Sequence, residues 1–408
     1  MGNYFDDKET RSEDKRQKDL AASLPIQILR AKAKVEGFSD ILRDIKPEEI
    51  TSRESLGNIK VLRKTDLISC QKKSPPFGGF YCYDEVKPDN IYQSPGPIYE
   101  PGLNRFDWWR TARFFNAVGI TSIDLVQNCF SYHFTPAGQM MENGIHALGA
   151  TVFPAGTGQT ELQARVASDL KATAYCGTPE YLLAILEKAE EMSLNVSSLK
   201  KAAVGGGPLF PNVRAAYVER GINCLQSYGT ADLGMIAYET IPDAPLVVEE
   251  DLIVEIVTPG TGSAVPDGEI GEVLVTTLNP NYPLIRFATG DLSAIETGIS
   301  ECGRTNTRLI GWKGRADQAT KVKGLFVRPE QVAELITRHP EIEKARIEIT
   351  LKGLSDFMVV KLIVRRELEV DYTVSVKDIF KLRAHVEMVA SGSLPNDGKV
   401  IDDKRPIE

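Results

Sequence analysis

The sequence has no apolar run near the roughly 20 residues that a membrane-spanning helix needs, so no membrane span is expected. Its six cysteines show no paired spacing, which favours the reduced thiols of a cytoplasmic protein over a disulfide framework or a zinc site. The chain has 48 basic and 56 acidic residues and a net charge of −8, so nucleic acid is not an expected partner. The N-terminal residues are charged and do not read as a secretory signal.

The length and patterning predict more than one domain. The chain has 408 residues, 42% hydrophobic and 25% charged, which is a globular balance over more length than one ordinary core occupies. Residues 24–42 carry apolar side chains every three or four positions and predict an amphipathic helix, and residues 105–117 predict a helix with an aromatic face. Residues 144–200 alternate strand and helix patterns, which predicts a parallel sheet covered by helices. Residues 252–278 predict two strands around a Pro/Gly-rich turn.

The stretch from Tyr282 to Leu325 combines an acid at a strand end with a turn that carries an arginine. It begins YPLIRFATGDL and continues, after a loop, with GWKGRADQATKVKGL. Asp291 can accept hydrogen bonds from the two hydroxyls of a ribose and Arg315 can donate to them. A hairpin with a surface ion pair would give the same pattern, because acids are common at strand ends.

Three motifs in this stretch resemble the adenylate-forming acyl-activating enzymes, and the phenylacetate–CoA ligases most closely. They are P-L-I-R-F-x-T-G-D-L, G-R-x-D and K-G-L-F-V-x-P-E-Q-V. The resemblance implies that Asp291 and Arg315 hold the ribose of ATP and that Asp317 is the hinge between a large and a small domain. It also implies that Lys323 and Gly324 face the channel for the thiol of coenzyme A.

The fold implied by this resemblance is acyl-CoA synthetase-like, with α/β and α+β parts. Residues 1–316 would form a large domain of mixed and parallel sheets with helices, including a β-rich part at about 245–316. Residues 317–408 would form a small, mobile α+β domain. Lys399 matches the lysine that neutralises charge between carboxylate and α-phosphate in this family. Only Cys302 remains where many relatives carry zinc ligands, so no structural zinc is expected.

The phosphate loop of the family falls on residues 91–101, which read IYQSPGPIYEP. Small residues let backbone N–H groups approach phosphate, and a lysine in the family's loop adds a positive charge. This chain keeps Ser94 and Gly96, but it has no lysine here, and Pro95 and Pro97 each remove a donor. A rigid Pro-rich turn is therefore as good a reading as a working phosphate cradle.

Two further segments match the nucleotide site of the family. Residues 202–209 read AAVGGGPL, and the glycines would let adenine lie on bare backbone beside Gly206, Gly207 and Pro208. The family motif Y-G-x-T-E is matched by Tyr228 and Gly229, with Thr230 one place early and Ala231 at the Thr position. The Glu that holds Mg²⁺ is replaced by Asp232, which keeps the charge with a shorter reach.

An acyl pocket is expected after residues 123–128, where the sequence continues with aromatic residues. Phe130, Tyr132 and Phe134, together with Gly205, would line a pocket for an aryl group, because aromatic rings offer large, flat contact areas. The same residues could be ordinary core. His133 has no acid at triad spacing, so it is not assigned as a base.

The resemblance implies ATP-dependent activation of a carboxylic acid to an acyl-AMP and then to a CoA thioester, and an aromatic acid is the expected substrate. ATP, Mg²⁺ and coenzyme A would take part, with Lys399 and Asp232 stabilising charge at phosphorus. Two alternatives stay open: a degenerate relative that binds acyl-nucleotide or CoA without adenylating, and an adenylating enzyme that passes the acyl group to an amine or a carrier protein. The sequence does not identify the carboxylic acid, and it does not decide whether the protein forms a homodimer.

Overall fold

The computed structural model describes residues 4–84, 86–94, 97–207, 209–298, 300–314, 316, 320–323, 325–352, 355–365, 370–395 and 399–405. The chain divides into two compact units. Unit 1 comprises Met1–Val254, Val275–Phe287 and Glu296–Gly311, and unit 2 comprises Glu255–Leu274, Ala288–Ile295 and Trp312–Glu408. The predicted domain boundary between residues 316 and 317 stays a prediction, since residues 315 and 317–319 lie outside the described residues.

Unit 1 contains an eight-stranded sheet with the strand order β14-β10-β9-β8-β7-β6-β4-β5. Its strands are β4 (Leu125–Asn128), β5 (Thr151–Phe153), β6 (Ala174–Gly177), β7 (Lys201–Val204), β8 (Asn223–Thr230), β9 (Gly234–Tyr238), β10 (Leu246–Val248) and β14 (Arg308–Leu309). The strands from β5 to β8 pair in parallel, and β9, β10 and β14 extend the sheet in antiparallel pairs. The parallel sheet predicted over residues 144–200 is thus confirmed.

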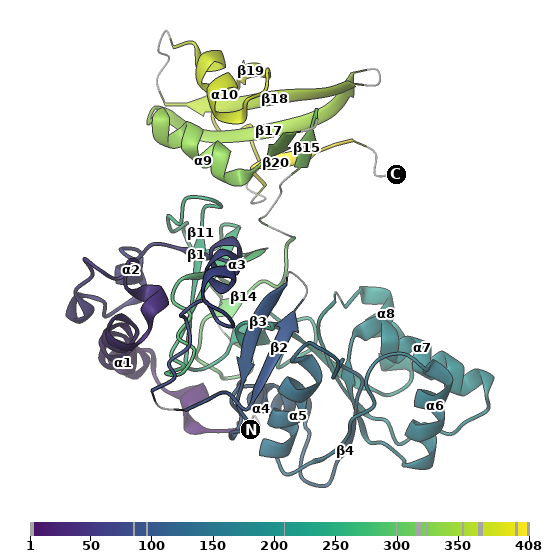
Figure 1. The fold of residues 1–408 in the computed structure, drawn as a ribbon. Coiled ribbons are helices and arrows are strands. Elements are labelled where there is room, and N and C mark those ends of the chain that lie inside the picture. Colours follow the sequence, from purple (N-terminus) through teal and green to yellow (C-terminus); the bar gives the residue numbers. More distant parts are fainter. Residues whose placement is uncertain are drawn as a thin grey trace. The chain divides into compact units, whose positions relative to one another are not determined.

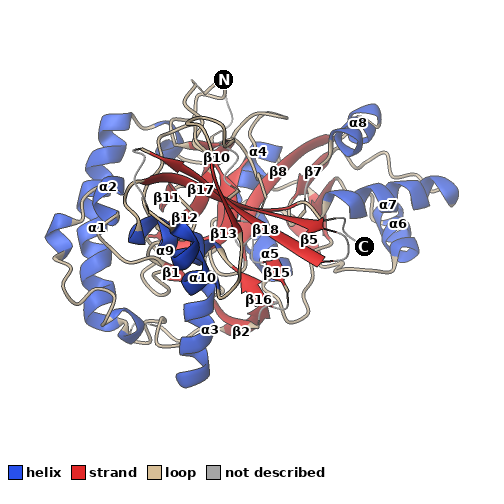
Figure 2. Ribbon diagram, turned by 90° about the horizontal axis from the view of Figure 1, so that it is seen from above, coloured by secondary structure: helices blue, strands red, loops and turns tan. Residues whose placement is uncertain are grey.

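Helices cover both faces of the parallel strands because their side chains alternate between two apolar clusters. Cys176 of β6 belongs to a cluster with residues of α4 (Ala112–Val118) and α5 (Ala137–Ala147). Its neighbour Tyr175 belongs to a second cluster with residues of α6 (Thr160–Asp169), α7 (Pro179–Glu191) and α8 (Pro211–Glu219). Figures 1 and 2 show α6, α7 and α8 grouped together. The period of two along each strand therefore builds a three-layer core.

The N-terminal segments of unit 1 differ in part from the expected helices. A 3-10 helix (Asp7–Thr10) precedes α1 (Glu13–Lys34), and the helix expected over residues 24–42 ends eight residues early, at Lys34. The next residue, Val35, has an extended φ of −122°. The chain continues with α2 (Arg53–Leu56), β1 (Leu62–Arg63), α3 (Lys64–Lys73) and the hairpin β2 (Asn90–Ser94) and β3 (Ile98–Gly102).

The helix expected over residues 105–117 is wrong for its first half, since α4 begins only at Ala112. Asp107 and Arg110 have φ values of 44° and 62°, in the left-handed region. The Asp107 carboxylate accepts the backbone N–H groups of Thr111 and Ala112 at 2.8 and 3.0 Å. The start of the helix is therefore fixed by this side-chain contact, and the preceding residues form a loop.

Unit 2 contains a four-stranded sheet in the order β19-β18-β17-β20. Its elements are the hairpin β15 (Thr320–Val322) and β16 (Leu325–Val327), α9 (Pro329–Arg338), β17 (Ile342–Lys352), β18 (Ser355–Val364), α10 (Tyr372–Phe380), β19 (His385–Met388) and β20 (Ile401–Asp403). Val332 and Leu335 of α9 enter the core as predicted. The central pair β17 and β18 is antiparallel, so an α+β arrangement is confirmed for this part of the chain.

Three further strands lie where the chain passes between the units: β11 (Leu252–Val257), β12 (Gly271–Thr277) and β13 (Phe287–Ser293). They agree with the β-rich pattern expected over this part of the sequence.

None of the helices in the described part of the chain combines the length and the apolar character that crossing a bilayer requires.

Candidate functional site

The glycine turn and the tyrosine segment of unit 1 lie at the same edge of the sheet. Gly205 and Gly206 follow β7, and Tyr228 and Gly229 are at the end of β8, which pairs with β7 in parallel. Since the carboxyl ends of parallel strands meet at one edge, these residues collect where open α/β sheets bind ligands. The structure thus brings together two segments that the sequence assigned separately to adenine.

Backbone space at the turn requires glycine at two positions. A Cβ on Gly205 would lie 2.6 Å from Ser227 Oγ, and Gly206 has a φ of 72°. The Gly205 N–H donates to the carbonyl of Gly177 at 3.1 Å, which anchors the turn to the end of β6. A Cβ on Gly207 would meet none of the described residues within 4 Å. A flat ligand would find exposed backbone here.

Asp232, the predicted metal ligand, is buried and paired with a lysine that the sequence analysis did not select. Lys64 Nζ, at the first residue of α3, lies 3.0 Å from Asp232 Oδ2. The lysine side chain is 34% exposed and the aspartate side chain 2% exposed. The second carboxylate oxygen, Asp232 Oδ1, is buried and has no hydrogen-bond partner among the residues that the structure describes.

A second carboxyl, that of Glu100 on β3, belongs to the same group of charges. Burial first, and then the neighbouring Asp232 carboxylate, raises the pKa of Glu100 well above its ordinary value. Within the described part of the chain, its oxygen Oε2 is buried without a hydrogen-bond partner, as is the hydroxyl of Tyr282. Burial, Asp232 and Glu100 also raise the pKa of Tyr282. We call Lys64, Ser94, Glu100 and Asp232 the acid cluster.

Ser94, predicted to contact phosphate, faces the acid cluster. Its hydroxyl donates to the Glu100 carboxyl across the β2–β3 hairpin. Gly96, the other retained residue of this loop, lies outside the described residues, as does Pro208 of the glycine turn. The Ser94 hydroxyl therefore has an acceptor within the chain, in a loop that has no lysine.

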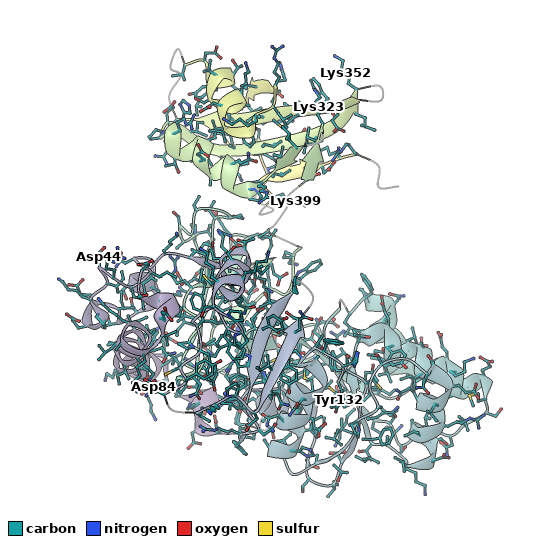
Figure 3. All side chains as sticks on the ribbon, viewed as in Figure 1. Asp44, Asp84, Tyr132, Lys323, Lys352 and Lys399 are labelled. Carbon is teal, nitrogen blue, oxygen red and sulfur yellow. The ribbon has the colours of Figure 1, made fainter. Side chains whose placement is uncertain are left out.

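The predicted acyl-pocket residues differ in their surroundings. Phe130 is buried, and a Cβ on Gly206 would lie 3.3 Å from its ring, so it adjoins the glycine turn. The Tyr132 hydroxyl, in the segment after β4 (Figure 3), accepts from Asn128 Nδ2 at 2.8 Å and donates to Glu142 Oε2 at 2.7 Å. Burial first, and then the Glu142 bond, raises the pKa of Tyr132. Phe134 is 64% exposed. Phe130 is thus the predicted acyl-pocket aromatic residue that the structure places beside the turn.

Unit 2 carries the remaining predicted site residues. Asp291 on β13 is buried, and its Oδ1 accepts the indole N–H of Trp312 at 3.1 Å. The Lys323 N–H, in the turn between β15 and β16, donates to Asp356 Oδ2 at 2.6 Å, and the carbonyl of Lys399 accepts from Arg346 Nη1 at 3.1 Å. Figure 3 marks both lysines.

Three other predicted residues of unit 2, Arg315, Asp317 and Gly324, lie outside the described residues. The ribose grip of Asp291 with Arg315, the hinge at Asp317 and the thiol channel at Lys323 and Gly324 therefore stay predictions.

The region expected to have lost zinc ligands is described in part. Ser300 Oγ lies 3.0 Å from Cys302 Sγ, and Asn306 Nδ2 donates to the carbonyl of Val248 at 2.8 Å. Within the described ranges, no three His, Cys, Asp or Glu side chains converge as a metal site would require. The expectation of no structural zinc stays a prediction.

Lys64 and Glu100 are the site residues that sequence reasoning missed. Lys64 lies in the segment 61–67, VLRKTDL, which precedes the Pro-rich loop of residues 91–101. Nothing in that segment indicates which residue Lys64 pairs with. Glu100 is the one acid in the Pro-rich segment 91–101. An acidic side chain next to a predicted phosphate loop is unusual, and this was the feature of the sequence that could have identified it.

Comparison with known proteins identifies the family to which the chain is related. A family model for AMP-binding enzymes matches residues 110–279. The phenylacetate-coenzyme A ligase of Aromatoleum evansii is 30% identical over 344 residues, which cover 80% of this chain and 76% of that protein. The enzyme of the same name from Pseudomonas putida is 28% identical over 339 residues, which cover 79% of this chain and 75% of that protein.

The solved structures agree as well. A crystal structure of 2-hydroxyisobutyryl-CoA ligase in complex with 2-HIB-AMP and CoA matches with a TM-score of 0.71 and 23% identity, over 98% of this chain and 91% of that one. This likeness confirms the predicted acyl-CoA synthetase-like fold. Together with the identity to the curated ligases, it shows that the chain belongs to the phenylacetate–CoA ligase family of adenylate-forming enzymes.

Proposed function

We propose that this protein is an AMP-forming acid–CoA ligase that activates a carboxylic acid, with aromatic acids as the preferred substrates. The observation that carries the proposal is the meeting of Gly205–Gly207 with Tyr228–Thr230 at the carboxyl edge of the parallel sheet, next to Asp232. Family membership supports the same activity, because the curated relatives are phenylacetate-coenzyme A ligases.

In the first reaction step a carboxylate oxygen of the acid attacks the α-phosphorus of ATP. The bond from that phosphorus to the oxygen bridging the β-phosphate breaks, and pyrophosphate leaves. Tyr228 and the glycine turn would hold the adenine, Asp291 the ribose, and Lys399 would neutralise charge between the two reacting groups. Phe130 would contact the acyl part beside the turn.

In the second step the sulfur of coenzyme A attacks the acyl carbon, the bond from that carbon to the phosphate oxygen breaks, and AMP leaves. We infer that residues 317–408 move as a small domain about Asp317 between the two steps. Lys399 would then leave the site, and Lys323 and Gly324 would face the thiol. This exchange explains how one site can serve two different nucleophiles.

Magnesium fits the acid cluster as a partner of the bound nucleotide. Asp232 Oδ1 and Glu100 Oε2 are buried acceptors without hydrogen-bond partners, and oxygen is the ligand atom that Mg²⁺ prefers. Asp232 would hold the ion, which would supply positive charge to the phosphates. Lys64, which pairs with the other Asp232 oxygen, would supply the cation that the Pro-rich loop lacks.

A second candidate function is supported by the hydrogen bond from Ser94 to Glu100. It occupies the hydroxyl that would otherwise reach phosphate, so a protein that binds acyl-AMP or CoA without adenylating would also fit. The proposed enzyme should then have weak contacts to the β- and γ-phosphates and normal contacts to adenosine.

The test is ATP–pyrophosphate exchange over a panel of aryl and alkyl acids, followed by thioester formation with CoA. We expect exchange with at least one aryl acid, a raised KM for ATP and tight binding of AMP. If AMP is released only when an amine or a carrier protein is the acceptor, that acceptor takes the place of CoA in the proposal. The absence of exchange with every acid, alongside intact binding of acyl-AMP, would leave the binding protein as the function.

A further inference from the structure

A pocket of about 560 Å³ opens in unit 1 among α1, the loop before α4 and the segment after β12. It is lined by three arginines, Arg30, Arg105 and Arg110, and by the aromatic residues Phe106 and Trp108. We call it the arginine pocket. None of its lining residues belongs to the glycine turn, the tyrosine segment or the acid cluster, so the nucleotide site does not explain it.

The wall of the arginine pocket is held rigidly before any ligand arrives. Asn143 Nδ2 donates to the carbonyl of Arg105 at 2.7 Å, and Asn143 Oδ1 accepts from the N–H of Trp108 at 2.8 Å. The Arg110 N–H donates to the carbonyl of Asp107 at 2.9 Å, and both residues have positive φ. A non-glycine residue in the left-handed region costs free energy and persists only where its surroundings fix it.

Two N–H donors on this wall have no acceptor. Trp108 Nε1 and Arg110 Nε are both buried, and neither has a hydrogen-bond partner among the described residues. Arg110 Nη2 donates to the carbonyl of Leu233, so the guanidinium is oriented by the protein while its Nε–H is left over. Burial lowers the pKa of Arg110, which reflects the missing solvation of its charge. A buried donor without an acceptor is costly, and an anionic ligand would remove that cost.

The charge of the arginine pocket is positive. Asp251 is the carboxylate among its lining residues, and Lys8 Nζ already pairs with that carboxylate at 2.8 Å. The lining residues thus include three arginines and one acid, and the carboxylates of Glu249 and Asp107 also act on Arg110. Arginine is the side chain best suited to bind carboxylate and phosphate groups, because its planar fork donates two parallel hydrogen bonds.

An apolar surface adjoins these charges. Phe106 is 74% exposed and Ile26, on α1, is 63% exposed, although both lie at the rim of a pocket. Exposed apolar side chains beside convergent polar groups are typical of sites that orient a small organic ligand.

We propose that the arginine pocket binds a small organic anion, with a carboxylate or phosphate group at the guanidiniums and an aromatic or alkyl portion against Phe106 and Ile26. The anion accepts the N–H groups of Trp108 and Arg110, and Arg105 at the rim adds a charge-assisted hydrogen bond. This site is separate from the proposed nucleotide site and does not rest on the proposed enzymatic activity.

The test is calorimetric titration of the intact protein with phenyl phosphate and phenylacetate, with inorganic phosphate and benzyl alcohol as the partial probes. We expect phenyl phosphate or phenylacetate to bind more tightly than both partial probes. Arg105→Gln should weaken binding about tenfold or more, because it removes a charged donor. Trp108→Phe, which keeps a ring but removes the unpartnered donor, should weaken it about threefold to tenfold.

Two controls make the result specific to the arginine pocket. Arg165→Gln changes an exposed arginine on α6 that pairs with Glu161 at 3.0 Å, and binding should not change. Tyr228→Ala changes the proposed nucleotide site, and binding of phenyl phosphate should again not change. Loss of binding in Tyr228→Ala with retention in Arg105→Gln, equal binding of benzyl alcohol, or no effect of both pocket variants would overturn the proposal. Which of the two anions binds more tightly assigns the ligand as a phosphate or a carboxylate.

Discussion

The acid cluster and the arginine pocket, both in unit 1, differ in what pairs with their charged groups. In the acid cluster the cation comes from the chain itself, since Lys64 pairs with Asp232 at 3.0 Å and Ser94 donates to Glu100. In the arginine pocket Trp108 Nε1 and Arg110 Nε are buried without acceptors. The acid cluster thus combines an internal ion pair with the acceptors Asp232 Oδ1 and Glu100 Oε2, which suit a cation, whereas the arginine pocket has donors that suit an anion.

This difference separates two kinds of charged residue in the molecule. Where the partner is internal, a substitution should first change the free energy of unfolding, because it leaves a buried charge without compensation. Where the partner is a ligand, a substitution should change binding or rate and leave stability nearly unchanged. The following predictions apply that distinction to the site residues, from the largest expected effect to the smallest.

Lys399→Ala should lower the rate of ATP–pyrophosphate exchange by about a hundredfold, because it removes a positive charge that stabilises the reacting phosphorus centre. Formation of the thioester from preformed acyl-AMP should change far less, since the proposed domain movement takes the lysine out of the site before this step. Lys404→Ala is the control, because Lys404 pairs with Glu348 at 3.0 Å within unit 2. Equal losses in both half-reactions would contradict domain movement between the steps.

Asp291→Ala should weaken AMP binding about tenfold to a hundredfold in a calorimetric titration, because the ribose hydroxyls lose their acceptor, at about 1–3 kcal/mol. Trp312→Phe is the matched control, because it removes the indole N–H that donates to Asp291 but keeps the carboxylate. If AMP affinity is unchanged in Asp291→Ala, the ribose assignment is wrong.

Lys64→Met should lower the free energy of unfolding by about 1–2 kcal/mol, since it leaves the buried Asp232 carboxylate uncompensated and the partial exposure of Lys64 limits the loss. Lys60→Met, at an exposed position nearby, should have little effect on denaturant unfolding. Adding Asp232→Asn to Lys64→Met should recover most of the stability. Lack of recovery would show that the lysine stabilises the fold through other contacts.

Cys302 should react with iodoacetamide at lower pH than the buried cysteines. Burial raises its pKa, but hydrogen bonds from Ser300, Thr240 and Arg304 outweigh that and hold the thiol pKa below its ordinary value. Burial raises the pKa of Cys129 and Cys224 to about 12, so those thiols stay protonated through neutral pH. Mass spectrometry of the modified peptides would check this.

Ser300→Ala should slow the reaction of Cys302 a few-fold, since one hydrogen bond to the thiolate is lost. The Cys302 thiolate is thus another negative charge whose hydrogen-bond partners belong to the chain itself. A rate at Cys302 equal to that at Cys129 would show that access, and not the hydrogen bonds, controls the chemistry.

Local patterns in the sequence account for much of the fold. The alternation of strand and helix over residues 144–200 predicts the parallel sheet, and the inward face of α9 follows from the spacing of Val332 and Leu335. The helix expected over residues 105–117 was wrong in its first half, because the Asp107 side chain caps α4 and two residues adopt positive φ. Hydrophobic spacing carries no information about such a contact.

The sequence by itself determined the family, the motifs and the elements that present Gly206, Tyr228 and Asp232 to one edge of a sheet. Only the tertiary structure decided that Lys64 pairs with Asp232, that Glu100 takes the Ser94 hydroxyl, and that arginines from two distant segments line one pocket. The physical reason is that periodicity and turn chemistry act over a few residues. The partner of a buried charge depends instead on which distant segments the hydrophobic core brings together.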